Sequence, residues 1–336
     1  MNIDALKSDL LSRIRTYDPP PKGFDPRTAT DEVLRRYGLP RRPHPEREPE
    51  LARMWKLAFS RPITFVKAEL AVDSVMSNRD ARRQRPARPQ LGQSGWAGVV
   101  RELYGKSDYA TPATMVFSQW AVPDVIAIDP AGYTPLTVGF WVGLDGFQGE
   151  ANGLLQAGVA ATVKPGFFDS SVEYWAWVEW YTAIEAGNYA ARMVNLPVAK
   201  GDAIFVLVCA PEPAFGLISM LNLSKGVATT VGISAPPKVT WLGGTAEWAV
   251  EGVSQYLPYF SPVTFTGCTG GSLHELFYLD PGGLVQNIVT VNANPAVDGQ
   301  PITNTYIASP TTFVVEWLGF GGSVLDPADA RISLSS

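Results

Sequence analysis

Residues 174–181 combine large rings with one carboxylate in a way that could support chemistry. Aromatic and β-branched residues favour a strand, and the side chains of a strand alternate between two faces. One face then carries Trp175, Trp177, Glu179 and Tyr181, and the other carries Tyr174, Ala176, Val178 and Trp180. Because burial raises the pKa of a carboxyl group, Glu179 among rings predicts a binding groove with an acid or base. The alternative is that both faces are core and Glu179 is a hydrogen-bonded structural acid.

Three further polar residues stand in apolar segments. Glu247 and Glu251 are four residues apart and share a face whether their segment is a strand or a helix, so the spacing does not decide between the two. Without further context, such a pair is found more often on a solvated edge. Gln156 lies in the apolar run 154–159, where a lone glutamine usually satisfies backbone groups. A site and a structural role both remain open for these three side chains.

The histidine count excludes most metal sites and most hydrolytic triads. The chain has two histidines, His44 and His274. The Pro- and Arg-rich run 39–45 predicts an exposed loop around His44, and His274 alone cannot make a metal site. No G-x-S-x-G turn is present to hold a nucleophilic serine. We expect no bound metal and no cofactor.

Composition indicates an acidic, folded protein. The 336 residues are 46% hydrophobic and carry a net charge of -5, which argues against a dedicated nucleic-acid binder. No stretch approaches the roughly 18 apolar residues of a membrane helix. Charged residues interrupt the N-terminal segment where an export signal has its apolar run, so no signal peptide is visible. Cys209 and Cys268 lie far apart and permit at most one disulfide.

The two ends of the chain differ in charge. Residues 1–90 carry 19 Lys and Arg against 12 Asp and Glu, a net charge of +7, whereas residues 91–336 carry 8 against 20, a net charge of -12. Opposite charges attract the two parts to each other. Apolar residues at helical spacing, with start and stop signals, predict three helices in the first part. These helices are expected at residues 6–14, 28–37 and 49–59.

From residue 94 onward the sequence pattern is typical of an all-β fold. Short β-type runs, such as residues 137–143, 204–208 and 312–317, are separated by Gly, Pro, Asn and Asp. They predict one sandwich or barrel. The basic, proline-punctuated run before it predicts an exposed linker. The expected parts are a basic helical region at 1–78, the linker at 79–93 and a β-sandwich at 94–336.

Five segments, in this order, resemble the motifs of the eqolisin family of glutamic endopeptidases. Residues 94–98 (S-G-W-A-G) resemble S-N-W-x-G, and residues 141–146 (W-V-G-L-D-G) resemble W-V-G-I-D-G. Residues 155–158 (L-Q-A-G) are similar to L-Q-T-G, and residues 174–181 (Y-W-A-W-V-E-W-Y) to Y-D-A-W-Y-E-W-Y. Residues 245–251 (T-A-E-W-A-V-E) resemble N-A-E-F-I-I-E. The resemblance covers most of residues 94–320.

The resemblance implies a fold and a site. The fold is a sandwich of two curved antiparallel sheets, related in shape to legume lectins and certain glucanases. Gln156 and Glu251 are implied as the catalytic pair, with Glu251 as the base that activates water in acid and Gln156 as the oxyanion donor. Asp145 and Glu179 are implied to orient the pair. The other residues expected in the substrate groove are Trp96, Trp141, Trp175, Trp177 and Glu247.

The basic N-terminal region is expected to act as a prosegment. Its helical apolar faces and positive charge would cover an acidic, aromatic groove, and acid would release it by protonating Asp and Glu while Lys and Arg stay charged. The alternative is an ordinary helical extension packed on the sandwich. The expected partners are polypeptide substrates and the intramolecular prosegment 1–78, with no nucleic acid and no membrane. The resemblance also implies an extracellular or acidic compartment.

Two other functions fit a lectin-like sandwich. A carbohydrate-binding module would stack Trp175, Trp177 and Tyr181 on sugar rings. A glycosidase would use Glu179 and Glu251 as its carboxylate pair. Neither function needs Gln156, so the surroundings of that residue distinguish them from a peptidase.

Overall fold

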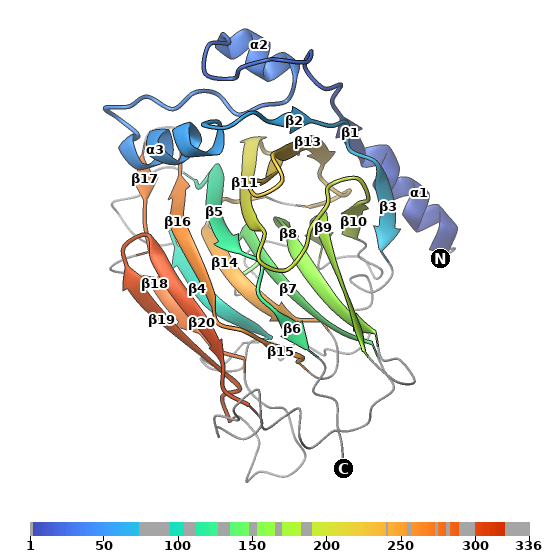
Figure 1. The fold of residues 1–336 in the computed structure, drawn as a ribbon, viewed down its shortest axis with the longest axis vertical. Helices are drawn as coiled ribbons and strands as arrows, with labels where there is room; N and C mark the ends of the chain where they lie inside the picture. Colours follow the sequence, from blue (N-terminus) through green and yellow to red (C-terminus); the bar gives the residue numbers. More distant parts are fainter. Residues whose placement is uncertain are drawn as a thin grey trace.

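Two large β-sheets lie face to face in this protein, and an N-terminal segment covers one end of the pair (Figure 1). The structure is a computed structural model. It describes residues 3–73, 95–103, 112–126, 135–147, 153–164, 170–182, 190–239, 241–253, 257–272, 275–279, 283–288 and 300–319. Apart from the pairing of β2 with β13, the described strand pairs of both sheets are antiparallel. The predicted all-β sandwich of antiparallel sheets is therefore confirmed.

The eight-stranded sheet contains the five motif segments. Its order is β18 (Gly283–Gln286), β4 (Trp96–Glu102), β14 (Thr245–Gly252), β7 (Leu136–Leu144), β8 (Gly153–Lys164), β9 (Ser171–Thr182), β10 (Ala190–Met193) and β3 (Leu70–Asp73). β7 and β14 are buried along their whole length. Both of their faces are therefore covered, which explains why their sequences contain few exposed polar residues.

The second sheet has ten strands. Along its main path the order is β1 (Ile14–Thr16), β13 (Val227–Ser234), β12 (Phe215–Asn222), β11 (Ala203–Glu212), β5 (Met115–Ala121), β16 (Val263–Gly271), β20 (Thr312–Trp317) and β19 (Thr303–Ser309). Outside this path β17 (Leu276–Phe277) pairs with β16, and β2 (Thr64–Phe65) pairs with β13. A separate small sheet joins β6 (Val125–Ile126) to β15 (Tyr259–Phe260).

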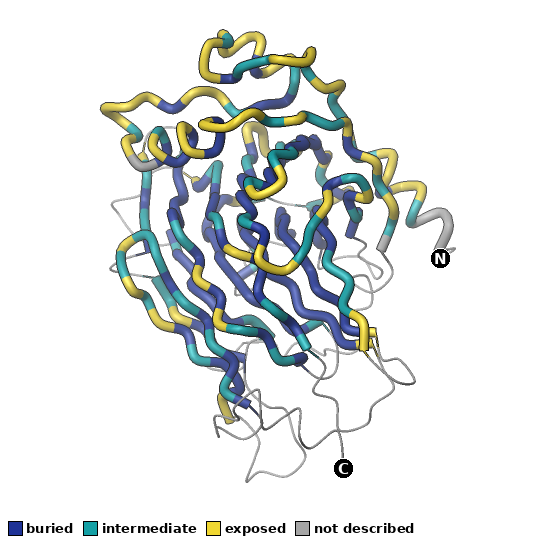
Figure 2. Tube along the Cα trace, in the orientation of Figure 1, coloured by how far each residue is buried: buried dark blue, intermediate teal, exposed yellow. Residues whose placement is uncertain are grey.

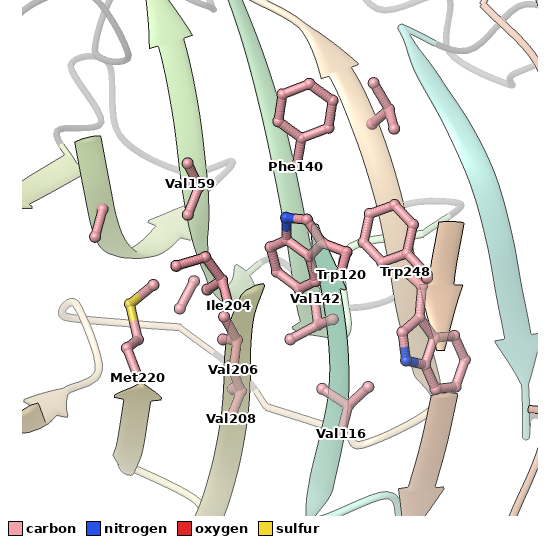
Figure 3. Packing of buried hydrophobic residues seen from close by; sticks show 14 of the residues in the cluster. Val116, Trp120, Phe140, Val142, Val159, Ile204, Val206, Val208, Met220 and Trp248 are labelled. Carbon is pink, nitrogen blue, oxygen red and sulfur yellow. The ribbon is translucent and has the colours of Figure 1, made fainter. Parts of the chain in front are cut away.

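The main hydrophobic core lies between the two large sheets. Alternate residues of the eight-stranded sheet, such as Phe140 and Trp248, point into it together with Val206 from β11 (Figure 3). The Trp248 indole also donates a hydrogen bond of 2.9 Å to the Phe117 carbonyl oxygen of the other sheet. The intervening residues of the eight-stranded sheet therefore face away from the ten-stranded sheet.

Three helices form where the sequence predicts them. They are α1 (Ile3–Arg13), α2 (Asp31–Arg36) and α3 (Pro49–Ala58). Thr30 caps α2, because its hydroxyl accepts a hydrogen bond from the Val33 amide. Pro49 stands in the first turn of α3, where its missing amide hydrogen costs no helical bond. The predicted linker at 79–93 lies outside the described residues.

Helices α2 and α3 pack on the outer face of the ten-stranded sheet. Leu34 and Met54 from the helices are buried in one cluster with Phe117 and Phe205 from the sheet. Figure 1 shows α3 next to the ends of β16 and β17. The prediction that these helices cover the aromatic groove is wrong, because the aromatic strand β9 belongs to the other sheet.

The N-terminal segment also adds strands to both sheets. β1 and β2 pair with β13, and β3 pairs with β10. Leu10 of α1 is 2% exposed and belongs to the core between the sheets. Residues 3–73 are therefore built into the sandwich by their strands as well as by their helices.

Cys209 and Cys268 are both free thiols. Cys209 packs against the cluster under the helices, whereas Cys268 is part of the core between the sheets, so the two side chains lie on opposite faces of the ten-stranded sheet. This arrangement leaves the two sulfur atoms without a path to a disulfide. Among the described residues, no helix has the length and apolar character to cross a membrane.

Candidate active site

The outer face of the eight-stranded sheet carries the residues that the sequence singled out. Its buried apolar side chains are Trp141, Leu154, Ala160, Trp175, Trp177, Tyr181, Ala190 and Ala249, with Trp96 and Val253 partly buried beside them. The rings that β9 contributes share this face with Glu179, as the alternation along the strand predicts. We call this surface the aromatic face.

Polar side chains cross the aromatic face at one level. The strand register aligns Glu247 of β14 with Gly143 of β7, and Gly143 with Gln156 of β8. Gln156 is in turn aligned with Glu179 of β9. We call Glu247, Gln156 and Glu179 the polar row. Gly143 leaves a position without a side chain between Glu247 and Gln156, and a Cβ added there would lie 2.8 Å from Leu154 Cδ1.

Glu251 lies on the aromatic face but outside the polar row. It is aligned with Gly139 of β7, whereas Gln156 is aligned with Gly143. The four residues between these levels correspond to about 13 Å along the strand. The register therefore places Glu247, and not Glu251, at the level of Gln156, while the expected catalytic pairing of Glu251 with Gln156 stays a prediction.

Gln156 is fully buried, and its amide is oriented by Glu179. Gln156 Nε2 donates a hydrogen bond of 2.7 Å to Glu179 Oε2. Because a carboxylate only accepts hydrogen bonds, this contact turns the amide nitrogen towards Glu179. Gln156 Oε1 has no hydrogen-bond partner within the described part of the chain. The partner of this glutamine is thus a carboxylate on the next strand rather than the backbone.

Glu247 is a buried acid. Its side chain is 0% exposed, and neither carboxyl oxygen has a hydrogen-bond partner among the residues that the structure describes. Burial raises the pKa of Glu247 well above its usual value, the nearby Thr245 hydroxyl lowers it by a smaller amount, and the charge of Asp145 raises it further. A buried carboxyl that is perturbed in this way is a candidate for a catalytic acid or base.

Asp145 holds the loop that leads into β14. Its carboxylate accepts hydrogen bonds from the amides of Leu242, Gly243 and Gly244 at 2.7, 2.9 and 2.8 Å. Burial raises the pKa of Asp145, although these hydrogen bonds lower it. Asp145 has a φ of 67°, a left-handed conformation that Asp tolerates better than most residues. Because Glu247 follows this loop directly, Asp145 positions Glu247 through the backbone.

The four tryptophans expected in the groove all lie on the aromatic face. Trp96 and Trp141 meet edge to face, with ring centroids 4.9 Å apart. Trp141 and Trp177 are fully buried and are aligned with Gly158 of β8, two residues beyond the polar row, on either side of that strand. The Arg192 guanidinium lies 5.4 Å from the ring centre of Trp175. The polar row is thus bordered by rings that exclude water.

The described residues contain no group of three or more side chains that could hold a metal ion. His44 is exposed in its loop, as predicted, and His274 lies outside the described residues. The groups that the polar row offers are a carboxyl that can exchange a proton and an amide that can donate and accept hydrogen bonds.

Sequence reasoning missed Gly143 and gave Glu247 only a place in the groove. The one available signal was the glycine itself, because a glycine inside an apolar strand often marks a close approach of other groups. Glu247 and Glu251 share a face, so only the register between strands separates them.

Comparison with models of protein families identifies the family of this chain. The family model of the Peptidase A4 family matches residues 94–317, which contain every residue of the polar row. The chain belongs to this family. It is therefore a peptidase, and the eqolisin resemblance seen in its motifs is confirmed. A comparison with curated proteins finds no match.

Three solved structures are similar to this peptidase. Scytalido-glutamic peptidase with a transition state analog inhibitor is 20% identical with a TM-score of 0.51, and the match covers 66% of this chain and 97% of that chain. SCP-B, a member of the eqolisin family in a complex with the tripeptide Ala-Ile-His, is 21% identical with a TM-score of 0.48. That match covers 66% of this chain and 97% of the SCP-B chain. Aspergilloglutamic peptidase from Aspergillus niger is 27% identical with a TM-score of 0.44, and the match covers 54% of this chain and 98% of that chain. The first likeness shows a shared fold.

The geometry gives no support to the two rival functions. A glycosidase would pair Glu179 with Glu251, but the register separates them by three strands and four residue levels. These separations are about 14 Å across the sheet and about 13 Å along it, whereas glycosidase carboxylates are roughly 5 to 10 Å apart. A carbohydrate-binding module does not require Gln156, whose side chain here donates a hydrogen bond to Glu179.

Proposed function

We propose that this peptidase is a glutamic endopeptidase that works without a metal, in which Glu247 is the general base and Gln156 stabilises the oxyanion. The polar row carries the proposal. It combines a buried carboxyl that has no hydrogen-bond partner among the described residues with a buried amide that a second carboxylate orients. Glu247 takes the role that the sequence resemblance gave to Glu251, because its level on the sheet is that of Gln156.

The chemistry requires one proton acceptor and one hydrogen-bond donor. Ionised Glu247 takes a proton from water as the water oxygen attacks the carbonyl carbon of the scissile bond. The carbonyl oxygen becomes an oxyanion and accepts a hydrogen bond from Gln156 Nε2. Protonated Glu247 then gives its proton to the leaving nitrogen as the C–N bond breaks, which yields an amine and a carboxylic acid.

Glu179 prepares Gln156 for this role. It uses one of the two N–H groups of the amide, so the second remains for the oxyanion, and Gln156 Oε1 remains to accept a hydrogen bond from the attacking water. The loss of an oxyanion donor typically lowers turnover about 10² to 10³-fold. We expect Gln156→Ala to lower kcat by a factor in this range while the protein stays folded.

The pKa of Glu247 determines the pH range of activity. Burial raises this pKa, and the group acts as a base only at a pH above it. The acid limb of the activity profile should therefore lie above the usual carboxyl pKa of about 4.3. An acidic optimum is still expected, because a carboxyl base works at a pH where histidine is protonated.

We also propose that the intact chain is latent. Gln156 and Glu247 are 0% exposed, so a substrate reaches them only after covering atoms move. This burial supports the zymogen part of the sequence prediction, whereas helices α2 and α3 give it no support because they pack on the other sheet. Incubation of the pure protein near pH 4, with product masses and activity followed together, tests latency. An intact 36.4 kDa chain that is active at once contradicts it.

Digestion of an unfolded protein substrate, at the acidic pH where activity is highest, tests the proposed mechanism. Cleavage should continue in the presence of pepstatin, which targets paired aspartates, and in the presence of a metal chelator. It should be nearly absent with the Gln156→Ala variant. Inhibition by pepstatin or by the chelator, or ordinary cleavage by the variant, contradicts the proposal.

A further inference from the structure

Residues 3–73 close the edges of both sheets on one side of the sandwich. β1 pairs with residues 231–233 of β13, and β2 pairs with residues 227–228 of the same strand. β3 pairs with all four residues of β10. Figure 1 shows these three strands of the N-terminal segment beside β13 and β10. Free strand edges tend to pair with other chains, so this segment protects the sandwich against such contacts.

The same segment covers a large apolar surface. Met54 of α3 packs against Gly267 of β16, where an added Cβ would lie 2.8 Å from Met54 Cε. Leu34 and Trp55 are buried in the same cluster, which includes Phe205 of β11. Figure 2 shows mostly buried strands beneath the segment, while much of its own outer surface is exposed. Departure of the segment would expose these apolar residues to water.

Neutral hydrogen bonds strengthen the contact. The Asn195 side chain accepts a hydrogen bond of 3.0 Å from the Glu69 amide and donates one of 2.8 Å to the Lys67 carbonyl oxygen. The Thr229 hydroxyl donates a hydrogen bond of 2.9 Å to the Val66 carbonyl oxygen. The backbone amide of Val66 donates to Ala228 at 2.9 Å. None of these bonds needs a charged side chain.

Ion pairs between described residues do not join the segment to the sandwich. Lys67 pairs with Asp18, and Arg41 pairs with Glu48, so these pairs lie within the segment. Charged groups of the two parts approach each other at a cavity of about 730 Å³. Its titratable lining is Asp31, Arg41, Arg42, His44, Arg47 and Glu48 from the segment and Glu275 from the sandwich. Protonation of Glu275 removes the one sandwich carboxylate in this lining.

We infer that residues 3–73 stay bound to the sandwich in acid, even after the chain is cut between residues 74 and 94. Acid neutralises carboxylates but leaves strand pairing and apolar packing unchanged. The attraction between the opposite net charges of the two parts is screened over about 8 Å at physiological salt, so its loss is a small effect. The bound segment is then a permanent partner of the sandwich. The inference does not depend on the proposed function.

A cut in the full-length chain tests this inference. A recognition sequence for a site-specific protease is inserted between residues 79 and 93, and the protein is cut and run on a sizing column near pH 7 and near pH 4. Both fragments should elute together as one particle of about the intact mass of 36.4 kDa at both pH values. Separation at either pH, whether the sandwich stays soluble or precipitates, overturns the inference.

Cys209 reports on the contact in the same sample. It is partly buried against the cluster under the helices, and burial raises its pKa to about 12. Its reaction with dithiodipyridine, which labels thiols in acid, should be equally slow before and after the cut. A rise of tenfold or more on cutting contradicts the inference.

A matched pair of variants on α3 compares the buried face of the helix, which contacts the sandwich, with its exposed face. Met54 is 1% exposed, whereas Leu57 is 48% exposed on the same helix. In the cut protein, Met54→Asp should speed Cys209 labelling at least tenfold, and Leu57→Asp should leave it unchanged. Equal labelling in the two variants contradicts an interface at this face of α3.

Discussion

Replacement of Glu247 with glutamine should stabilise the protein at neutral pH. Burial raises the pKa of Glu247 in the folded state, and glutamine has nearly the same size without the ionisable proton. For a carboxyl whose folded pKa is raised, the stabilising effect is complete below the unfolded pKa and is lost as the pH rises through the folded pKa. The variant should therefore match the wild type near pH 4. Near pH 7 it should gain more than about 1 kcal/mol, because a tenfold change in the proton affinity of a carboxyl group already corresponds to about 1.4 kcal/mol.

Urea unfolding followed by tryptophan fluorescence measures this gain. The free energies of unfolding of wild type and Glu247→Gln are compared near pH 4, pH 5.5 and pH 7. Glu32→Gln, at an exposed position on α2, serves as the control and should follow the wild type throughout. A difference between wild type and Glu247→Gln that stays constant with pH would refute the desolvation of Glu247.

Three further predictions follow from single contacts. Gly143→Ala should lower kcat/KM at least tenfold and also lower stability, because its Cβ would lie 3.3 Å from the Gln156 Cβ, 3.0 Å from the Trp141 ring and 2.8 Å from Leu154 Cδ1; a variant with full activity contradicts the proposed spacing. Asp145→Asn should cost about 1 to 3 kcal/mol of unfolding free energy, since an amide cannot accept all three loop hydrogen bonds. Because Cys209 and Cys268 are free, a reducing agent should not change the thermal midpoint, and a drop would indicate a disulfide.

Local sequence patterns predicted several of the elements. The runs at 137–143, 204–208 and 312–317 lie within β7, β11 and β20, because the strand preference of β-branched and aromatic residues is local to a few neighbouring positions. Start and stop signals located α2 and α3 for the same reason. The alternation in β9 also predicted which of its side chains share the aromatic face.

These local patterns could not predict which residues from distant parts of the sequence lie next to each other. Glu247 and Glu251 lie on one face of one strand, and their distances to Gln156 depend on the alignment of β14 with β7 and of β7 with β8. Similarly, an apolar helix face shows that a partner surface exists but not which sheet supplies it. The charge difference between the two parts suggested a cover over the acidic groove, whereas apolar packing holds α2 and α3 on the opposite sheet.

Peptide hydrolysis by two glutamine variants tests the central claim most directly. Glu247→Gln and Glu251→Gln make the same chemical change on the same face of β14, at two levels of the sheet. Activated protein of each kind is assayed on one peptide across the acidic pH range. The register predicts that Glu247→Gln loses turnover at least 10²-fold, while Glu251→Gln keeps turnover within about tenfold of the wild type. The reverse order would contradict the assignment of Glu247 as the base.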